Sequence, residues 1–168
     1  AEGGGSVGAA IFIFGSVITC ALALAIATPF SLATAIFMTE ISPELGKRFV
    51  QPAVEIFVGI PSVVYGWIGL TILVPLIKNI FNLRFGFSVL AAGIVLAVMI
   101  FPTITSLAAD ALRSIPKSYR AASYGLGATR WLSIAMVVVR AAVSGLMTAV
   151  IVGLGGAFGE ALAVALVI

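Results

Sequence analysis

A long stretch without any charged side chain opens the chain, from Gly3 to Thr39. About 20 apolar residues are enough to cross the hydrocarbon core of a membrane, which is roughly 30 Å thick. Only 9% of the 168 residues are charged and 62% are hydrophobic. Soluble domains ordinarily have about a quarter of their residues charged. The sequence therefore predicts an all-α, multi-pass protein of the membrane.

Four apolar segments are long enough to span. We predict transmembrane helices over about Val7 to Phe30, Pro52 to Leu76, Phe85 to Ala109, and Ala142 to Ile168. The second is interrupted by Pro61, Gly66 and Gly69, and such breakers are tolerated where neighbouring protein satisfies the freed backbone groups. The loops between the spans are predicted at Glu40 to Val50, with Pro43 and Gly46 as turn formers, at Lys78 to Arg84 and around residues 110–140. In the last of these, Asp110 and Arg113 are expected to form a local helix pair, and Leu132 to Val139 an interfacial helix.

The basic residues indicate the orientation of these spans, because cytoplasmic loops are enriched in Lys and Arg. Seven basic residues fall in the two loops predicted on one side and only two in the loop on the other. The loops around 40–50 and 110–140 are therefore predicted to be cytoplasmic. The seven are Lys47, Arg48, Arg113, Lys117, Arg120, Arg130 and Arg140, and the two are Lys78 and Arg84.

The longest polar interruption is Ile115 to Trp131. Pro116 suits the first turn of a helix, and no breaker follows it before Tyr124, so a short helix is predicted over Lys117 to Tyr124. Gly125 and Gly127 end it, and Thr129 can cap a second helix. The expected result is a short helix exposed between two spans.

Residues Arg120 to Trp131, RAASYGLGATRW, resemble the cytoplasmic loop by which permeases of ABC importers dock on their ATPase. The stretches GIPSVVYG at Gly59 to Gly66 and GLGGAFGEALAV at Gly153 to Val164 extend the resemblance to the phosphate-importer branch of that family. The resemblance implies that docking residues are Pro116, Lys117, Ser118, Tyr119, Arg120, Ala121, Ala122, Ser123, Tyr124, Gly125, Leu126 and Gly127.

This chain departs from the pattern of the family at three positions. The acidic residue of the loop falls on Ala121, the proline that closes the motif falls on Arg140, and the arginine of the last segment falls on Gly156. The resemblance implies several partners: ATPase subunits, a second permease subunit and an extracytoplasmic substrate-binding protein. It places the protein among the lipids of the cytoplasmic (inner) membrane.

Two carboxylates and one glycine are candidates for the substrate path. Glu160 stands about 30 Å from Arg140 along a continuous helix, and a carboxylate at membrane depth is by default a functional candidate. The alternative for Glu160 is an interface partner for a basic side chain. Gly156 lies one helical turn before it. Glu55 is also a candidate, although a position in the first turn of its helix, where the dipole favours an anion, explains it better.

The chain has no constellation for catalysis. It has no histidine and a single cysteine, so the usual zinc spacings are absent, and no glycine-rich loop precedes Lys-Ser/Thr. We therefore predict no enzyme activity, no metal and no cofactor, with ATP bound by a partner subunit. The small net charge of +3 is divided among loops and does not indicate nucleic-acid binding.

Two other function classes stay open. A secondary transporter or channel without an ATPase would use Glu160 to bind a coupling ion, and an inverted repeat, which we do not find, would favour it. A structural membrane subunit would explain the glycine-rich last span but leave the polar loop without a use. We expect one permease domain over residues 1–168, with one further span before it and one after.

Overall fold

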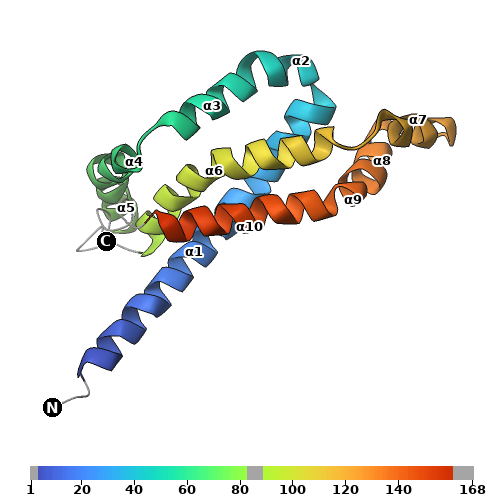
Figure 1. Ribbon diagram of the computed structural model, residues 1–168. Helices are drawn as coiled ribbons and strands as arrows, with labels where there is room; N and C mark the ends of the chain where they lie inside the picture. Colours follow the sequence, from blue (N-terminus) through green and yellow to red (C-terminus); the bar gives the residue numbers. More distant parts are fainter. Residues whose placement is uncertain (1–3, 83–88, 161–168) are drawn as a thin grey trace. The chain divides into compact units, whose positions relative to one another are not determined.

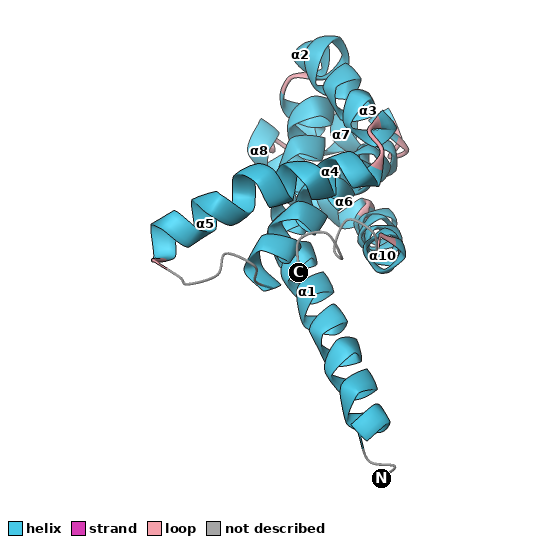
Figure 2. Cartoon of the chain, turned by 90° about the vertical axis from the view of Figure 1, so that its left-hand side faces the viewer, coloured by secondary structure: helices cyan, strands magenta, loops and turns pink. Residues whose placement is uncertain are grey.

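The computed structural model describes residues 4–82 and 89–160, and almost all of them are helical (Figure 1). No strand occurs within these ranges, where Figure 2 shows helices joined by short loops. The predicted all-α class is confirmed. The segments are α1 (Gly4–Ile36), η1 (Phe37–Ile41), α2 (Pro43–Leu45), η2 (Gly46–Val50), α3 (Gln51–Gly59), α4 (Ser62–Ile68), η3 (Gly69–Leu73), α5 (Val74–Phe81), α6 (Val89–Arg113), α7 (Lys117–Gly125), α8 (Arg130–Ser133), η4 (Ile134–Val138), α9 (Val139–Ala141) and α10 (Val143–Gly159), where η marks a π-helical turn.

Three helical runs are long and apolar enough to cross a membrane: Gly8–Ile41, Ser62–Phe81 and Val89–Arg113. Arg130–Ala141 and Val143–Gly159, bent by 66° at Ala142, make a fourth if the pair is one span. The described residues thus contain three or four candidate spans, against about four predicted. The predicted boundary between an interfacial helix and the last span coincides with this bend, and the last eight residues of that span lie outside the described ranges.

The first predicted loop is wrong, because Glu40 to Val50 is helical apart from Ser42. α1 passes Pro29 and continues through η1, and α2 begins with Pro43 at its first position, where proline needs no N–H partner. Gly46 does not form a turn. A Cβ there would lie 2.7 Å from the Cα of Met38, so glycine permits a close approach of two helical segments.

The second predicted span breaks at Pro61 alone. α3 ends at Gly59, and Pro61 has an extended backbone (φ −59°, ψ 141°) before α4 begins. Gly66 and Gly69 are buried within a helical run that continues to Phe81. Proline removes a helical N–H and clashes with the preceding turn, whereas a glycine costs only about 1 kcal/mol and keeps its hydrogen bond. Because the helix continues past both glycines to Phe81, Lys78 lies in α5 and not in the predicted loop.

The residues group into two compact units, which we describe separately. One contains the described parts of residues 1–27, 60–100 and 154–168, and the other contains Thr28–Gly59 and Phe101–Gly153. In the first unit α5 packs on α6, and Gly93 of α6 faces Leu22 of α1. The buried cluster between α5 and α6 consists of Val74, Ile77, Ala91, Ala92, Val95 and Met99.

The second unit carries the polar segment that the sequence singles out. Its core is built from the later part of α1, the later part of α6, η4 and α10. A hydroxyl joins two of them, because Ser31 Oγ of α1 donates to the carbonyl of Phe101 in α6 at 3.2 Å. Buried apolar members of this core include Ala35, Met38, Ile104, Ala108, Leu112, Ile134, Val138, Leu146 and Ala149.

Candidate functional site

α7 forms where the sequence predicts a short helix, and it ends one residue later, at Gly125. Pro116 precedes it with extended backbone and accepts a hydrogen bond from Tyr119 N at 3.1 Å. The chain leaves the helix at Gly127, whose φ of 83° is left-handed and whose N–H donates to the carbonyl of Tyr124. A glycine reaches that conformation at little cost. Gly127 therefore terminates α7, and Gly125 is its last helical residue.

The predicted cap of the next helix is confirmed. Thr129 is extended (φ −69°, ψ 161°), and its hydroxyl accepts from the N–H of Leu132 at 3.3 Å. α8 begins one residue after it and stands beside α7 (Figure 1). A buried hydrogen bond of 2.6 Å between the hydroxyls of Ser123 and Ser133 joins the two helices. The glycine turn and the cap thus set α7 against α8 in a defined arrangement.

Arg120 fixes the other side of α7 to the end of the first candidate span. Its Nε donates to Oε2 of Glu40 at 3.0 Å, and its Nη2 pairs with Oε1 of the same carboxylate. Further donors reach the carbonyls of Ile115 at 2.9 Å and Leu112 at 3.2 Å. The side chain of Glu40 is 8% exposed and that of Arg120 21%. Hydrogen bonding to Glu40 raises the pKa of Arg120 above its usual range, so the guanidinium stays charged.

Arg130 adds a second tie to the same helix end. Its Nη2 donates to the carbonyls of Glu40 at 2.6 Å and Ile41 at 2.8 Å. These are the last carbonyls of η1, which have no partner further along the helix, and a cation near a helix C-terminus is also favoured by the helix dipole. The two arginines therefore hold the α7–α8 turn on the C-terminal end of η1.

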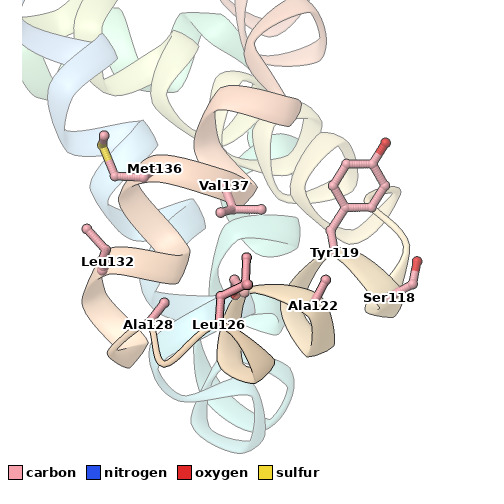
Figure 3. A pocket seen from close by; sticks show the side chains of 9 residues that line it. Ser118, Tyr119, Ala122, Leu126, Ala128, Leu132, Met136 and Val137 are labelled. Carbon is pink, nitrogen blue, oxygen red and sulfur yellow. The ribbon is translucent and has the colours of Figure 1, made fainter.

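An apolar hollow of about 650 Å³ lies along one face of α7 (Figure 3). In Figure 3 the side chains of Leu126 and Val137 point into the space between α7 and the helical segment that carries Leu132 and Met136. Leu126 is 90% exposed, and a leucine so placed is typical of a surface that a partner covers. The lining residues are Ser118, Tyr119, Ala122, Ser123, Leu126, Ala128, Leu132, Met136 and Val137.

Glu55 does not lie in the first turn of a helix, so the dipole explanation is wrong. Helical backbone runs without a break from Pro43 to Gly59, and Glu55 is near its end. Its Oε1 accepts from Nε2 of Gln51 at 3.1 Å, and Gln51 in turn accepts from Nη2 of Arg113 at 3.1 Å. Arg113 also forms the expected local pair with Asp110, at 3.5 Å. The place of Glu55 on a substrate path stays a prediction.

Gly156 and Glu160 lie at the C-terminal end of α10. Gly156 is exposed, and a Cβ on it would meet no described atom within 4 Å. Glu160 is partly buried and directly follows the last residue of α10. The helix between Arg140 and Glu160 is not continuous, as the estimate of 30 Å assumed, because the chain bends by 66° at Ala142. From Val143 to Gly159 the helix rises about 25 Å at 1.5 Å per residue.

Residues 27–168 match the family model described as "Binding-protein-dependent transport system inner membrane component". The chain belongs to this family. The match covers α7, both arginines and Glu40 as well as α10. It confirms the family to which the sequence motifs were assigned, and it makes the protein a transport-system component of the inner membrane.

Named relatives agree with this family. The chain is 59% identical over 157 residues to the "Probable ABC transporter permease protein YqgH" of Bacillus subtilis, which covers 94% of the chain and 51% of the relative. It is 39% identical over 180 residues to the "Phosphate transport system permease protein PstC" of Haemophilus influenzae (96% and 57%) and 38% identical over 182 residues to PstC of Pasteurella multocida (97% and 57%). The chain thus spans about half the length of these curated relatives.

Glu40 was not predicted to be part of the site around α7. It was assigned only to a polar loop, 80 positions before Arg120. One signal was available. Glu40 is the first charged residue after the uncharged opening stretch, and its loop was predicted on the same side of the membrane as α7. A carboxylate next to an apolar stretch needs a cation, and α7 carries two, Lys117 and Arg120.

Proposed function

We propose that the chain is the membrane-spanning permease subunit of an ATP-binding-cassette importer and that α7 is the element on which its ATPase acts. The observation that carries the proposal is the attachment of α7, an exposed helix that is tied to the end of a candidate span through Arg120, Glu40 and Arg130. A helix held in this way transmits a displacement to the span instead of absorbing it.

The apolar hollow is the surface on which the ATPase docks in this proposal. Its exposed members are Tyr119 of α7, Leu126 directly after α7, and Leu132 and Met136 of the next helical segment, so an inserted side chain would contact both helices. Helix-in-groove recognition depends on close approach and apolar fit. ATP binds the partner, and this chain supplies no catalytic residue to hydrolysis.

A bulky residue in the hollow tests the docking role. Ala122 is exposed and lines the hollow, so Ala122→Trp fills the space without disturbing a buried contact. We expect ATP-driven uptake by the reconstituted transporter to be lost while membrane insertion is kept. Ala53→Trp, at an exposed alanine of α3 away from the hollow, is the matched control. Unchanged uptake in Ala122→Trp would contradict the docking role.

The proposed cargo is an inorganic anion, most simply phosphate, because several relatives are named as phosphate permeases. A carboxylate on the path repels phosphate unless a cation accompanies it. Glu160 has Gly156 one turn earlier, where the resembling permeases have arginine. We propose that the cation comes from the second permease subunit, which pairs with this one in the inner membrane, and that an extracytoplasmic binding protein delivers the anion.

Restoring the arginine tests this assignment. A Cβ at Gly156 meets no described atom within 4 Å, so the first carbon of an arginine side chain fits there without a clash. If the cargo is phosphate, the variant keeps or improves reconstituted phosphate uptake. Gly155→Arg, equally open but turned by about 100° around the helix, is the control. Three results together would instead support a cation-coupled transporter. Gly156→Arg would lose uptake, the parent would carry a cation flux, and that flux would no longer depend on pH in Glu160→Gln.

A further inference from the structure

A second hollow, of about 680 Å³, lies on the opposite face of α7 from the apolar one. The residues of α7 that line it are Lys117, Arg120, Ala121 and Tyr124, whereas Ser118, Tyr119, Ala122 and Leu126 line the apolar hollow. At 3.6 residues per turn these two sets point to opposite sides of a helix. We call the second one the basic hollow. It lies between α7 and the helical segment that carries Glu40 and Lys47.

The charges around the basic hollow do not balance. Arg120 is neutralised by Glu40, the one carboxylate in the lining, and four of its N–H bonds are already donated. Arg113 has Asp110 and Gln51 as partners. The ammonium groups of Lys47 and Lys117 are exposed and have no partner among residues 4–82 and 89–160. Two cations therefore face the same space without a counter-charge.

We propose that the basic hollow binds a phosphoryl anion, either the headgroup of an anionic phospholipid or free inorganic phosphate. Lysine ammonium groups are flexible point charges that suit the separate oxygens of a phosphate. The lining also includes apolar Met38 and Ile115, which suits the glycerol part of a lipid. Basic pockets between the cytoplasmic ends of membrane helices are recognised by anionic headgroups. The bound anion would lie directly beside the Arg120–Glu40 pair.

Ala121 gives the sharpest variant, because its side chain is a methyl group that lines the hollow. In Ala121→Glu the new carboxylate stands four residues after Lys117, within reach of its ammonium, and it occupies the hollow with the charge of the ligand. Ala121→Gln has nearly the same size and no charge. The difference between these two variants therefore isolates charge from bulk, at an exposed helical position where neither should prevent folding.

Binding is measured on the full-length protein in neutral detergent, without ATPase or ATP, so that the result is independent of the proposed transport function. One arm adds phosphatidylglycerol or phosphatidylcholine and reads bound lipid by native mass spectrometry. The other titrates inorganic phosphate by calorimetry. We expect Lys47→Gln and Lys117→Gln each to weaken binding about fivefold, and Ala121→Glu at least as much. Ala121→Gln, which adds the same bulk without the charge, should weaken binding less than Ala121→Glu does. Lys78→Gln, at an exposed lysine of α5 outside the hollow, is the second control.

Selective retention of phosphatidylglycerol with this pattern of variants supports the site and identifies a lipid. Phosphate binding with the same pattern supports the site and identifies the free anion. The proposal is overturned if Ala121→Glu and Ala121→Gln behave alike, if Lys78→Gln weakens binding as much as the hollow lysines do, or if neither probe binds.

Discussion

α7 and α10 meet their neighbours by different means. α7 is held by directional polar bonds, from Arg120 to Glu40 and between the hydroxyls of Ser123 and Ser133. α10 is held by close approach, because a Cβ on Gly153 would lie 2.6 Å from Cδ1 of Ile104 in α6. Small residues of this kind let two helices pack closely inside a membrane, where no hydrophobic force drives them together.

This difference determines what each element offers to a partner. Arg120 and Ser123 of α7 find their partners within the chain, so the position of α7 is fixed before any partner arrives. α10 uses only some of its glycines on its own chain, since Gly155, Gly156 and Gly159 meet no described atom within 4 Å of a Cβ position. The face of α10 that carries these glycines is therefore suited to packing against a second helix. α7 is suited to transmitting a force from a partner to the span.

The largest effect is expected from breaking the polar attachment. Arg120→Ala would leave the carboxylate of Glu40, only 8% exposed, without its cation. Removing one partner of a buried ion pair costs about 3–5 kcal/mol, so we expect a large fall in the thermal stability of the purified protein. The double variant with Glu40→Ala should lose less than the sum of the two single variants, because they share one interaction.

Arg113→Ala is the matched control for that experiment. Its partner Asp110 has a side chain that is 71% exposed, and an exposed ion pair contributes little. The idea that α7 is anchored by charge would fail if Arg113→Ala and Arg120→Ala lowered the melting temperature equally.

The close approach of α10 is broken by a single methyl group. In Gly153→Ala the added Cβ meets the side chain of Ile104, which is completely buried. Overpacking of this kind costs about 1–3 kcal/mol. We expect a lower melting temperature with α7 unaffected, as judged by hydrogen exchange of its amides. Unchanged stability would contradict close packing of α10 on α6 at Gly153.

The cap of α8 should have a smaller effect. Thr129→Val keeps the size and branching of the side chain but removes the oxygen that accepts from Leu132 N. Loss of such a cap costs about 0.5–2 kcal/mol, and the bond here is long at 3.3 Å, which favours the lower part of that range. Thr129→Ser, which keeps the acceptor, should behave like the parent in the same unfolding experiment. Equal losses in both variants would assign the effect to packing.

What the sequence could predict is mostly local. The short helix over Lys117 to Gly125, the cap at Thr129 and the Asp110–Arg113 pair each depend on residues within a few positions of one another. Their chemistry can be read from spacing alone. The all-α membrane class could also be predicted, because a long uncharged apolar stretch is typical of a helix that spans a membrane.

Contacts between distant segments could not be predicted. Glu40 and Arg120 are 80 residues apart. Both were predicted on the same side of the membrane, but no sequence feature pairs one with the other. Pro43 and Gly46 were interpreted as turn formers, whereas one begins a helix and the other allows the close approach to Met38. Each residue type serves both purposes, and only the packing of the chain decides between them.

The smallest effect, and the most informative about α10, is expected from Gly156→Ala. It adds the same methyl group as Gly153→Ala, one turn further along the same helix, but into space where no described atom lies within 4 Å. We expect the stability of the isolated subunit to change by less than about 1 kcal/mol, with any change in the stabilising direction, because alanine loses less entropy in a helix than glycine. If Gly156 instead contacts a second permease subunit, the same variant should weaken that pairing, as measured by co-purification. Destabilisation of the isolated subunit equal to that of Gly153→Ala would show that both halves of α10 are packed within this chain and would remove the open face from consideration as an interface.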